Sequence, residues 1–253
     1  MFAQERLDSI TQLLYKDGKV IVKDLSKKYQ VSEDAIRKDL KILENQGIME
    51  RTYGGGILKK RIAEFTNVGD RNKKDKTVKN IIANKAFKLI KRGETILLDI
   101  SSTNMILAEM IRDSEMEITV ISNSIDILYI LSKSSKITLI SPGGMYFCQA
   151  GGFVGSETIN SIRKYNVQKA FIGSCGVDLD LKSITTFNVE DGNTKNAFIH
   201  CGKEVFLVME NKKFNYDGIY KFANINQITG IITEGEPSNM ILKKLNKNKI
   251  NLL

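Results

Sequence analysis

The sequence has little of what would place it in several large classes of protein. It contains three cysteines in 253 residues, Cys148, Cys175 and Cys201, an odd number without C-x-x-C spacing. This argues against a disulfide scaffold or a structural metal and favours a reducing compartment. No apolar run approaches the roughly 20 residues that a membrane-spanning helix needs, and the opening "MFAQERLDSI" lacks the apolar core of a signal peptide. We expect a cytoplasmic protein with no membrane contact, no metal and no cofactor.

Acidic residues are the scarcer charged type, with 29 Asp and Glu against 38 Lys and Arg, giving a net charge of +9. The excess lies mainly near the N-terminus. Residues 1–60 hold 12 basic and 9 acidic residues, and residues 61–80 hold 6 and 3. This distribution suits a polyanionic partner, although a solvated lysine face has the same composition.

The first 47 residues predict three short helices. Apolar residues keep helical spacing over 2–16 and again over 22–29. Ser32 is a good N-cap for the third helix, which Gly47 is expected to end. The third helix is expected to bury an apolar stripe and to present basic residues on its free face. The stripe is Ile36, Leu40 and Leu43, and the basic residues are Arg37, Lys38 and Lys41.

The stretch "IMERTYGGGI" follows this helix, alternates apolar and polar residues and ends in three glycines. It predicts a β-hairpin carrying Arg51 and Tyr53. Two helices joined by a tight turn and followed by a hairpin are typical of a winged helix-turn-helix, whose second helix enters the major groove of DNA. The hairpin can then lie on the phosphate backbone, where glycines permit close approach. We favour DNA binding over a basic face that is merely solvated.

The pattern of apolar and polar residues changes after a charged, weakly periodic segment at 58–77, which we interpret as a linker. From residue 78 onward, helical segments alternate with short apolar runs such as "TILLDI", "ITVISN" and "EVFLVME". Apolar strands separated by helices predict a mainly parallel sheet buried on both faces. We therefore divide the chain into a DNA-binding domain at 1–57, a linker at 58–77 and an α/β domain at 78–253.

Small, polar or glycine-rich loops follow the predicted strands, and three of the four precede predicted helices. They are 99–103, 122–124, 142–144 and 173–176. Ligands of open α/β sheets bind at the carboxyl ends of the strands, and N–H groups at a helix start form an anion site. Lys213 adds a point charge after another strand. Each loop alone could simply be a cap or a turn, but several together favour an anionic ligand.

The N-terminal motifs resemble those of the DeoR family of bacterial sugar-responsive transcriptional regulators. The residues that carry this resemblance are "VSEDAIRKDL" at 31–40 and "RTYGGG" at 51–56. It implies that Arg37 and Lys38 are the main contacts with double-stranded operator DNA and that Ser32 lies near a phosphate. Ala35 stands where the family usually has threonine, which removes a hydroxyl contact.

The resemblance extends through nearly all of the second domain, whose family counterpart is similar to the sugar-phosphate isomerase fold. The matching blocks include "ETILLDISSTN", "ITVISNSIDIL", "ITLISPGG" and "KAFIGSCGVD". The family's loops surround a phosphorylated sugar. Carried over, the effector-binding residues are Asp99, Ser101, Ser102, Thr103, Asn123, Ser124, Gly143, Gly144, Asp191, Lys195 and Lys213. Departures from the family pattern occur at Ser101, Ser102, Gln168 and Glu210-Asn211.

Three functions compete on this sequence. The favoured one is a transcriptional regulator, most simply a repressor of carbohydrate-metabolism genes, that binds operator DNA as a homodimer or homotetramer and senses a phosphorylated sugar. The second is a sugar-phosphate isomerase or deaminase with a DNA-binding appendage. It needs a positioned acid or base, yet the single histidine, His200, falls outside every loop named above. The third, a structural DNA binder, leaves those loops without a ligand.

Overall fold

The computed structural model describes residues 2–63 and 68–253. The chain forms two compact units, Met1–Arg61 with Pro237–Lys244, and Ile62–Glu236 with Leu245–Leu253. The segment predicted as a linker, 58–77, is thus divided between the two units, and its residues 64–67 lie outside the described residues. In the part of the chain that is described, no helix is both long and apolar enough to cross a membrane.

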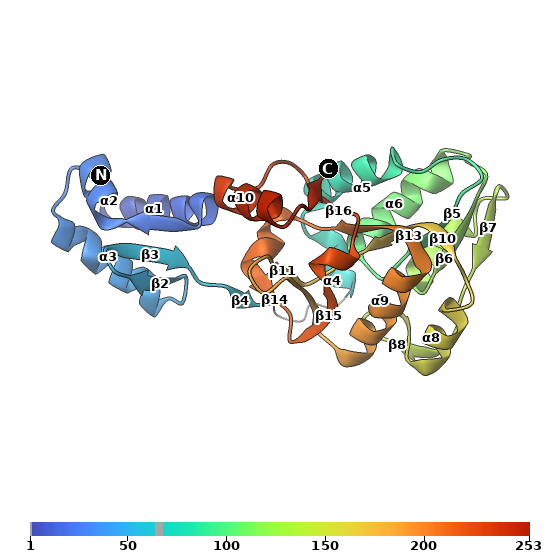
Figure 1. Ribbon diagram of the computed structural model, residues 1–253. Coiled ribbons are helices and arrows are strands. Elements are labelled where there is room, and N and C mark those ends of the chain that lie inside the picture. The colour runs from blue at the N-terminus through green and yellow to red at the C-terminus, as the bar shows by residue number, and fades with distance from the viewer. Residues whose placement is uncertain (1, 64–67) are drawn as a thin grey trace. The chain divides into compact units, whose positions relative to one another are not determined.

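The N-terminal part of the first unit, up to Arg61, contains helices α1 to α3 and a small sheet (Figure 1). The helices are α1 (Ala3–Asp17), α2 (Val22–Tyr29) and α3 (Glu33–Asn45), and the strands are β1 (Lys19–Ile21), β2 (Met49–Thr52) and β3 (Gly55–Leu58). The strands form an antiparallel sheet in the order β1-β3-β2. The core of this unit consists of Leu7, Ile10, Leu14, Val20, Val22, Leu25, Ile36, Leu40, Leu43 and Met49. These features confirm the predicted winged helix-turn-helix.

Helix α3 begins and ends where its sequence predicts. The Ser32 hydroxyl accepts a hydrogen bond from the Ala35 N–H at 3.2 Å, which satisfies one of the free donors of the first turn. At the other end Gly47 adopts a φ of 68°, and the Ile48 N–H donates to the Leu43 carbonyl at 3.0 Å. This is a Schellman-type ending, in which glycine takes the left-handed position without strain.

The glycines of the β2–β3 hairpin are required by the fold of the hairpin itself. Gly54 has a φ of 84° in the turn. A Cβ at Gly55 would lie 2.1 Å from the Val20 carbonyl oxygen, and a Cβ at Gly56 would lie 1.8 Å from the Met49 methyl carbon. The sequence analysis assigned these glycines to close approach to a phosphate backbone. In the structure, Gly55 and Gly56 allow close approach between the strands and the core.

The second unit is built on a seven-stranded sheet with the order β17-β16-β13-β10-β5-β6-β7, in which the described pairings are parallel. The strands are β5 (Thr95–Leu98), β6 (Ile118–Ser122), β7 (Ile137–Ile140), β10 (Val167–Ile172), β13 (Gly202–Val208), β16 (Gly230–Ile232) and β17 (Asn251–Leu252). This confirms the predicted mainly parallel α/β domain.

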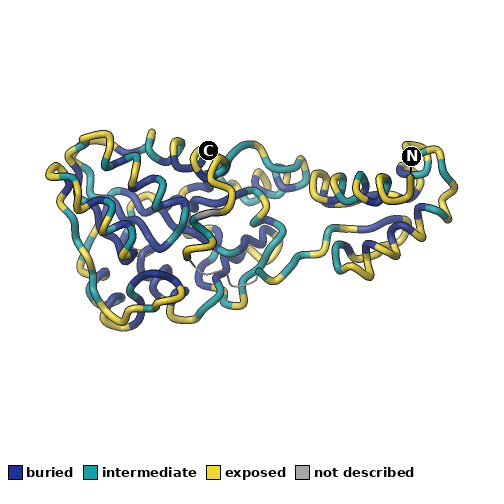
Figure 2. Tube along the Cα trace, turned by 180° about the vertical axis from the view of Figure 1, so that it is seen from behind, coloured by how far each residue is buried: buried dark blue, intermediate teal, exposed yellow. Residues whose placement is uncertain are grey.

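Helices cover both faces of this sheet. They are α5 (Lys76–Phe87), α6 (Ser102–Asp113), α7 (Ile125–Leu131), α8 (Ser156–Ile162) and α9 (Val189–Cys201). Ile96 and Leu98 of β5 belong to the cluster formed with α5 and α6, while Leu97 between them is also fully buried. Because successive side chains of a strand point to opposite faces, both faces are covered. Figure 2 shows buried backbone in the interior of this unit and exposed backbone mainly at its outer turns and helices.

Smaller elements complete the second unit. Three strands, β11 (Gly176–Asp178), β12 (Ser183–Thr186) and β15 (Tyr220–Asn224), form an antiparallel sheet. Strands β8 (Met145–Phe147) and β9 (Gly152–Val154) form a hairpin. The other elements are α4 (Val68–Lys73), η1 (Asn211–Asn215), β14 (Tyr216–Asp217) and η2 (Ile225–Gln227). The boundary between the two units divides β4 (Arg61–Ile62) and α10 (Asn239–Lys247). Of the four predicted ligand loops, only those at 99–103 and 122–124 lead into helices. The other two lead into β8 and β11, which corrects the prediction of three helix starts.

Candidate functional site

The exposed face of α3 carries the predicted basic residues. Arg37, Lys38 and Lys41 are all exposed, opposite the buried Ile36 and Leu40. The Arg37 guanidinium donates to Glu33 and Asp34, at 2.7 Å each, in the first turn of the same helix. These exposed pairs contribute little to stability. They hold the guanidinium beside the N-terminal end of the helix, which is the end that faces base edges in this motif.

The hairpin places its predicted residues on the outside of the unit. Arg51 lies on β2, and Tyr53 is fully exposed in the turn between β2 and β3. Both can therefore reach a partner without a change in the core. Their exposure fits contacts with a phosphate backbone.

A buried ion pair orients α3, and the sequence analysis did not find it. Arg6 of α1 donates to both carboxylate oxygens of Asp39, at 2.6 and 3.2 Å. Asp39 lies on the buried side of α3 although its neighbours Lys38 and Lys41 are exposed. A bidentate Arg–carboxylate contact fixes the relative orientation of the two side chains and also pairs their charges. The pair therefore sets how α1 and α3 pack, and with it the direction in which the basic face points.

A pocket lies in the second unit at the carboxyl ends of β5 and β10, the two central strands. It is partly open to solvent. The residues that line it are Arg71, Ile100, Ser101, Ser102, Thr103, Gly173, Ser174, Cys175, Thr186, Phe187, Asp191, Lys195 and Lys213. The position agrees with the rule for ligands of open α/β sheets.

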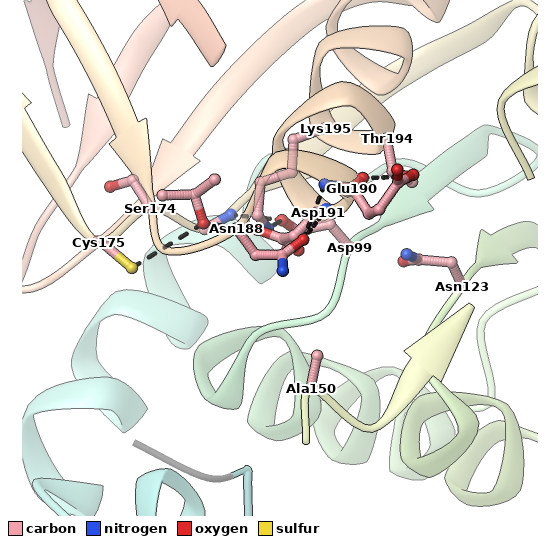
Figure 3. Close-up of polar contacts among 12 residues, drawn as sticks. Asp99, Asn123, Ala150, Ser174, Cys175, Asn188, Glu190, Asp191, Thr194 and Lys195 are labelled. Carbon is pink, nitrogen blue, oxygen red and sulfur yellow. Dashed lines mark hydrogen bonds and ion pairs between the residues drawn. The ribbon is translucent and has the colours of Figure 1, made fainter. Parts of the chain in front are cut away.

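The inner wall of this pocket is a network of buried charges (Figure 3). The Lys195 ammonium group donates to the carboxylate of the fully buried Asp99, and its Nζ lies 3.7 Å from Oδ1 of Asp191. Burial alone would lower the pKa of Lys195, but Asp191 and Asp99 together raise it above its usual value. Lys195 is therefore a fixed cation between two carboxylates. Asp191 also accepts a hydrogen bond from the Thr186 hydroxyl at 2.6 Å.

Asp99 holds the two central strand ends together. Burial raises the pKa of this carboxyl group, while Lys195 and the Gly173 N–H oppose that shift. The Gly173 N–H donates to one carboxylate oxygen at 2.9 Å, and the Asn104 amide donates to the other at 2.8 Å. Asp99 thus links the end of β5 to the loop after β10 and to α6. Its role is to position Lys195 at the pocket wall.

Two further features give the pocket a positive character. Lys213, in η1, donates to the Ser174 carbonyl at 2.6 Å, and among the described residues it forms no ion pair with a carboxylate. Burial lowers its pKa. Helix α6 begins at the pocket, with the Ser101 hydroxyl accepting from the Asn104 N–H at 3.1 Å. Ser102 and Thr103 occupy the first turn, where N–H groups are free of intrahelical partners and attract anions.

Comparisons with known proteins identify both units. Residues 6–61 match the DeoR-like helix-turn-helix domain, and residues 74–235 match the DeoR C terminal sensor domain. The chain belongs to the DeoR family. It is accordingly a DNA-binding transcriptional regulator with a sensor domain, and not an enzyme.

Relatives of this DeoR-family chain match it from end to end. It is 31% identical over 253 residues to the HTH-type transcriptional repressor GlcR of Bacillus subtilis (strain 168), covering 100% of this chain and 96% of the relative. It is 25% identical to the glycerol-3-phosphate regulon repressor of Escherichia coli (strain K12), covering 98% and 97%. The tetrameric eIF2B-beta2-delta2 complex from C. thermophilum matches with a TM-score of 0.50 at 14% identity, over 93% of this chain and 70% of that one. That likeness concerns the fold alone.

Several effector residues implied by the DeoR resemblance lie together in this pocket. Ser101, Ser102, Thr103, Asp191, Lys195 and Lys213 line it, and Asp99 lies directly behind Lys195. Asn123, Ser124, Gly143 and Gly144 are not among its lining residues. They follow β6 and β7, strands further toward one edge of the sheet.

These four residues have local structural contacts instead. The Asn123 amide donates to the Phe153 carbonyl at 2.8 Å, and Ser124 caps α7. Gly144 has a φ of 116°, and a Cβ there would lie 2.1 Å from the Thr158 hydroxyl. In Figure 3, Asn123 lies apart from the cluster around Lys195. Their part in effector binding stays a prediction.

Most of the residues that depart from the DeoR pattern make local contacts that fit their side chains. A Cβ at Gly173 would lie 2.7 Å from the Ser101 Cβ, so a glycine across the pocket makes room for the bulkier serine. Gln168 accepts a hydrogen bond from the Thr95 N–H at 2.7 Å, at the amino end of the sheet and away from the pocket. Asn211 donates to the Gly235 carbonyl at 2.9 Å. Of these departures, those at Ser101 and Ser102 border the pocket.

Some pocket residues were absent from the predicted set, namely Arg71, Thr186 and Phe187 together with Ser174 and Cys175. The last two belong to the loop 173–176, which the sequence analysis noted without assigning. Thr186 is the last residue of β12, a strand outside the main sheet, and Phe187 follows it. Arg71 lies in the segment taken as a linker, where its charge does not distinguish it from several neighbouring lysines. His200, which the sequence pattern places between a helix and a strand, lies in the last turn of α9, exposed and outside the pocket lining.

Proposed function

We propose that this DeoR-family regulator is a repressor of carbohydrate-metabolism genes, and that a phosphorylated sugar bound in the pocket controls its affinity for operator DNA. The observation that carries the proposal is Lys213, a cation that faces the pocket and forms no ion pair among the described residues. A phosphate ester supplies the missing counter-charge. Charge-assisted hydrogen bonds of this kind are about twice as strong as neutral ones.

The phosphate group would lie between Lys213 and the start of α6. The N–H groups and hydroxyls of Ser102 and Thr103 are the nearby donors. Because α6 has 12 residues, its N-terminus also carries the partial positive charge of a full helix dipole. Lysine acts as a point charge and the helix start as a set of directed donors, so the two are complementary.

The sugar would lie against the buried charge network. Asp191, Lys195 and Thr186 offer acceptors and donors for hydroxyl groups, and Ile100 and Phe187 provide apolar walls. A pocket with apolar walls and a few fixed polar groups discriminates by orientation. We propose that this wall distinguishes one sugar phosphate from another, and that Lys213 and α6 recognise the phosphate shared by all of them.

The names of the relatives support the same function. The Bacillus subtilis relative is named as a transcriptional repressor, and the Escherichia coli relative as the repressor of the glycerol-3-phosphate regulon. Glycerol 3-phosphate is a phosphate ester of a polyol, which is the class of compound that we propose for the pocket. The enzymatic alternative has no support from these relatives.

On the DNA side we propose that α3 enters the major groove of operator DNA. Arg37, Lys38 and Lys41 would contact bases and phosphates, with Ser32 near a phosphate. Arg51 and Tyr53 of the hairpin would lie on the backbone. One short helix reads few base pairs, so the active form would be a homodimer or homotetramer on repeated half-sites.

Calorimetric titration tests the effector proposal. The wild-type protein is titrated with glucose 6-phosphate, fructose 6-phosphate, glycerol 3-phosphate, ribose 5-phosphate and their unphosphorylated parents. We expect one phosphorylated compound to bind, its parent to bind far more weakly, and Lys213→Ala to lower the affinity tenfold or more, because a hydrogen bond to a charged group is lost.

The matched control is Lys203→Ala. Lys203 is an exposed lysine at the amino end of β13, the end opposite to that followed by Lys213. This variant should bind the sugar phosphate like the wild type. Equal affinities in wild type and Lys213→Ala would place the phosphate elsewhere, and the absence of binding by every phosphorylated compound would end the sensor proposal.

A further inference from the structure

Arg71 reaches the pocket from an unexpected part of the chain. It lies in α4, between the regions that match the helix-turn-helix domain, 6–61, and the sensor domain, 74–235. It nonetheless lines the pocket together with Lys213 and the start of α6. The segment that connects the two family domains in the sequence therefore supplies a pocket side chain of its own.

The Arg71 guanidinium is poorly satisfied. Its Nε is buried and has no hydrogen-bond partner among the described residues. One terminal nitrogen donates to the Ala150 carbonyl at 3.5 Å, the outer limit of a hydrogen bond. No ion pair between Arg71 and a carboxylate is found in the part of the chain that the structure describes. A buried donor without an acceptor is costly, and a bound anion would remove that cost.

The backbone around Arg71 is held firmly. The buried Lys79, in α5, donates to the carbonyls of Arg71 and Lys74, at 2.5 and 2.6 Å. Asp75 accepts from Lys212 at 2.6 Å, and this hydrogen bond lowers the pKa of Asp75. Lys212 is adjacent to Lys213 in η1 and also pairs with Glu210 at 2.7 Å. The turn after α4 is thus tied to the element that carries Lys213.

Arg71 and Lys213 form a pair of like charges at one pocket. Burial is the main cause of the lowered pKa of Lys213, and the charge of Arg71 adds to it. Lys195, the third cation of the pocket, is already matched by Asp99 and Asp191. The positive charge that has no carboxylate partner therefore belongs to Arg71 and Lys213. A phosphate, with a charge between −1.5 and −2 at pH 7, has about the charge needed to match them.

We propose that Arg71 is the second cationic ligand of the phosphate, and that through Arg71 the bound effector fixes the segment between the two domains. The inference rests on the proposed function, because it assumes a phosphorylated effector in this pocket. Arginine binds phosphate through two parallel N–H donors, so binding draws the guanidinium toward the phosphate and immobilises the turn that Lys79 and Lys212 hold. The occupied pocket then differs from the empty one in the segment that leads to the DNA-binding domain.

Three variants of the full chain separate charge, geometry and location. Arg71→Gln removes the positive charge. Arg71→Lys keeps the charge but cannot donate two parallel hydrogen bonds as the guanidinium does. Lys74→Gln, an exposed lysine three residues later, is the matched control. The probe is the phosphorylated compound that binds the wild type most tightly in the panel above. We expect Arg71→Gln to lose at least tenfold in affinity, Arg71→Lys to lose less and Lys74→Gln to bind like the wild type.

Hydrogen–deuterium exchange of the backbone amides of residues 68–79 supplies a second readout. We expect the same phosphorylated compound to slow exchange in the wild type and in Lys74→Gln. In Arg71→Gln, at a concentration that saturates the pocket, exchange over these residues should remain close to that of the unliganded protein. A side chain that served only the stability of α4 would raise exchange equally with and without the compound.

The outcomes separate this inference from the proposed function. If Arg71→Gln binds the compound like the wild type while Lys213→Ala does not, Arg71 is not a ligand and the sensor function stands. The coupling part is overturned if the wild type shows no protection of residues 68–79. If no phosphorylated compound binds the wild type, the proposed function and this inference fall together.

Discussion

At the scale of single residues, the charge state of Lys213 has the largest expected effect on the affinity for the phosphorylated compound. Burial lowers its pKa in the unliganded protein, whereas an adjacent phosphate favours the charged form. As pH rises through this lowered pKa, Lys213 loses its proton in the empty pocket. Binding of the phosphate must then restore that proton, which lowers the affinity. Affinity for the phosphorylated compound should therefore fall on the alkaline side, beginning below the usual pKa of lysine. It should also fall on the acid side near pH 6, where the phosphate takes up a proton.

The pH dependence has a built-in control. Lys213→Arg keeps its charge throughout, because the pKa of arginine lies above 12. Titration of both proteins at a series of pH values should show the alkaline loss in the wild type and its absence in Lys213→Arg. The same alkaline loss in both would assign it to a group other than Lys213.

Arg37 and Lys38 are the corresponding residues on the DNA side. Both are exposed on α3, and Arg37 is held near the helix start by Glu33 and Asp34. We expect the double substitution Arg37→Ala, Lys38→Ala to abolish shifts of an operator selected by the wild type from random duplexes. Lys88→Ala, Lys91→Ala, two exposed lysines of the second unit, should leave the shifts and their salt dependence unchanged. A doubly substituted protein with wild-type affinity and salt slope would remove α3 from the interface.

At the scale of elements, most helices and strands follow from local patterns in the sequence. Helix α3 shows why: its cap, its apolar stripe and its terminal glycine all lie within 16 consecutive residues, Ser32 to Gly47. The pairing of β1 with β3, and of Arg6 with Asp39, depends on contacts between distant residues. No local period predicts such contacts, because they arise only when separate elements pack.

The same limit applies to the pocket. The sequence placed small polar loops after successive strands, and all of them could have met at one sheet edge. The strand order puts β5 and β10 side by side and β7 at the edge, so the loops at 99–103 and 173–176 meet while 142–144 does not reach the lining. Strand order is set by packing over long chain separations. The sequence does not predict Arg71 as a pocket residue, because the lack of hydrogen-bond partners for its guanidinium depends on which residues surround it in the fold.

The β2–β3 hairpin provides a prediction about an element. A side chain at Gly55 would meet the backbone of β1, which cannot move aside as a flexible side chain can. Gly55→Ala should therefore separate β1 from β3, lower the thermal stability of the first unit and weaken operator binding. Gly235→Ala, where nothing lies within 4 Å of the added carbon, is the control and should do neither. Circular dichroism melts and operator shifts measure both effects, and a fully stable Gly55→Ala protein would contradict the tight packing of the hairpin.

At the scale of the whole molecule, one copy of α3 offers too little contact for a specific site. Helix-turn-helix proteins solve this by pairing recognition helices on half-sites about one helical turn, or a multiple of it, apart. We expect the protein–operator complex to contain two or four chains and the selected operator to contain a repeat. Sedimentation velocity of the free protein and of the complex measures the number of chains. A single chain bound to a site without repetition would contradict the proposed assembly.

The central claim for the whole molecule is that the pocket and α3 are coupled. A ligand can change operator affinity only by its differential affinity for two states of the protein, and such coupling is typically about 1–3 kcal/mol, or 5–150-fold. Most directly, the claim is tested by operator affinity measured with and without the phosphorylated compound that binds the wild type, in the wild type and in Lys213→Ala. The account predicts that the compound weakens operator binding by the wild type within that range, and that Lys213→Ala binds the operator equally well but no longer responds. An operator affinity that the compound leaves unchanged in the wild type, at concentrations that fill the pocket, would contradict it.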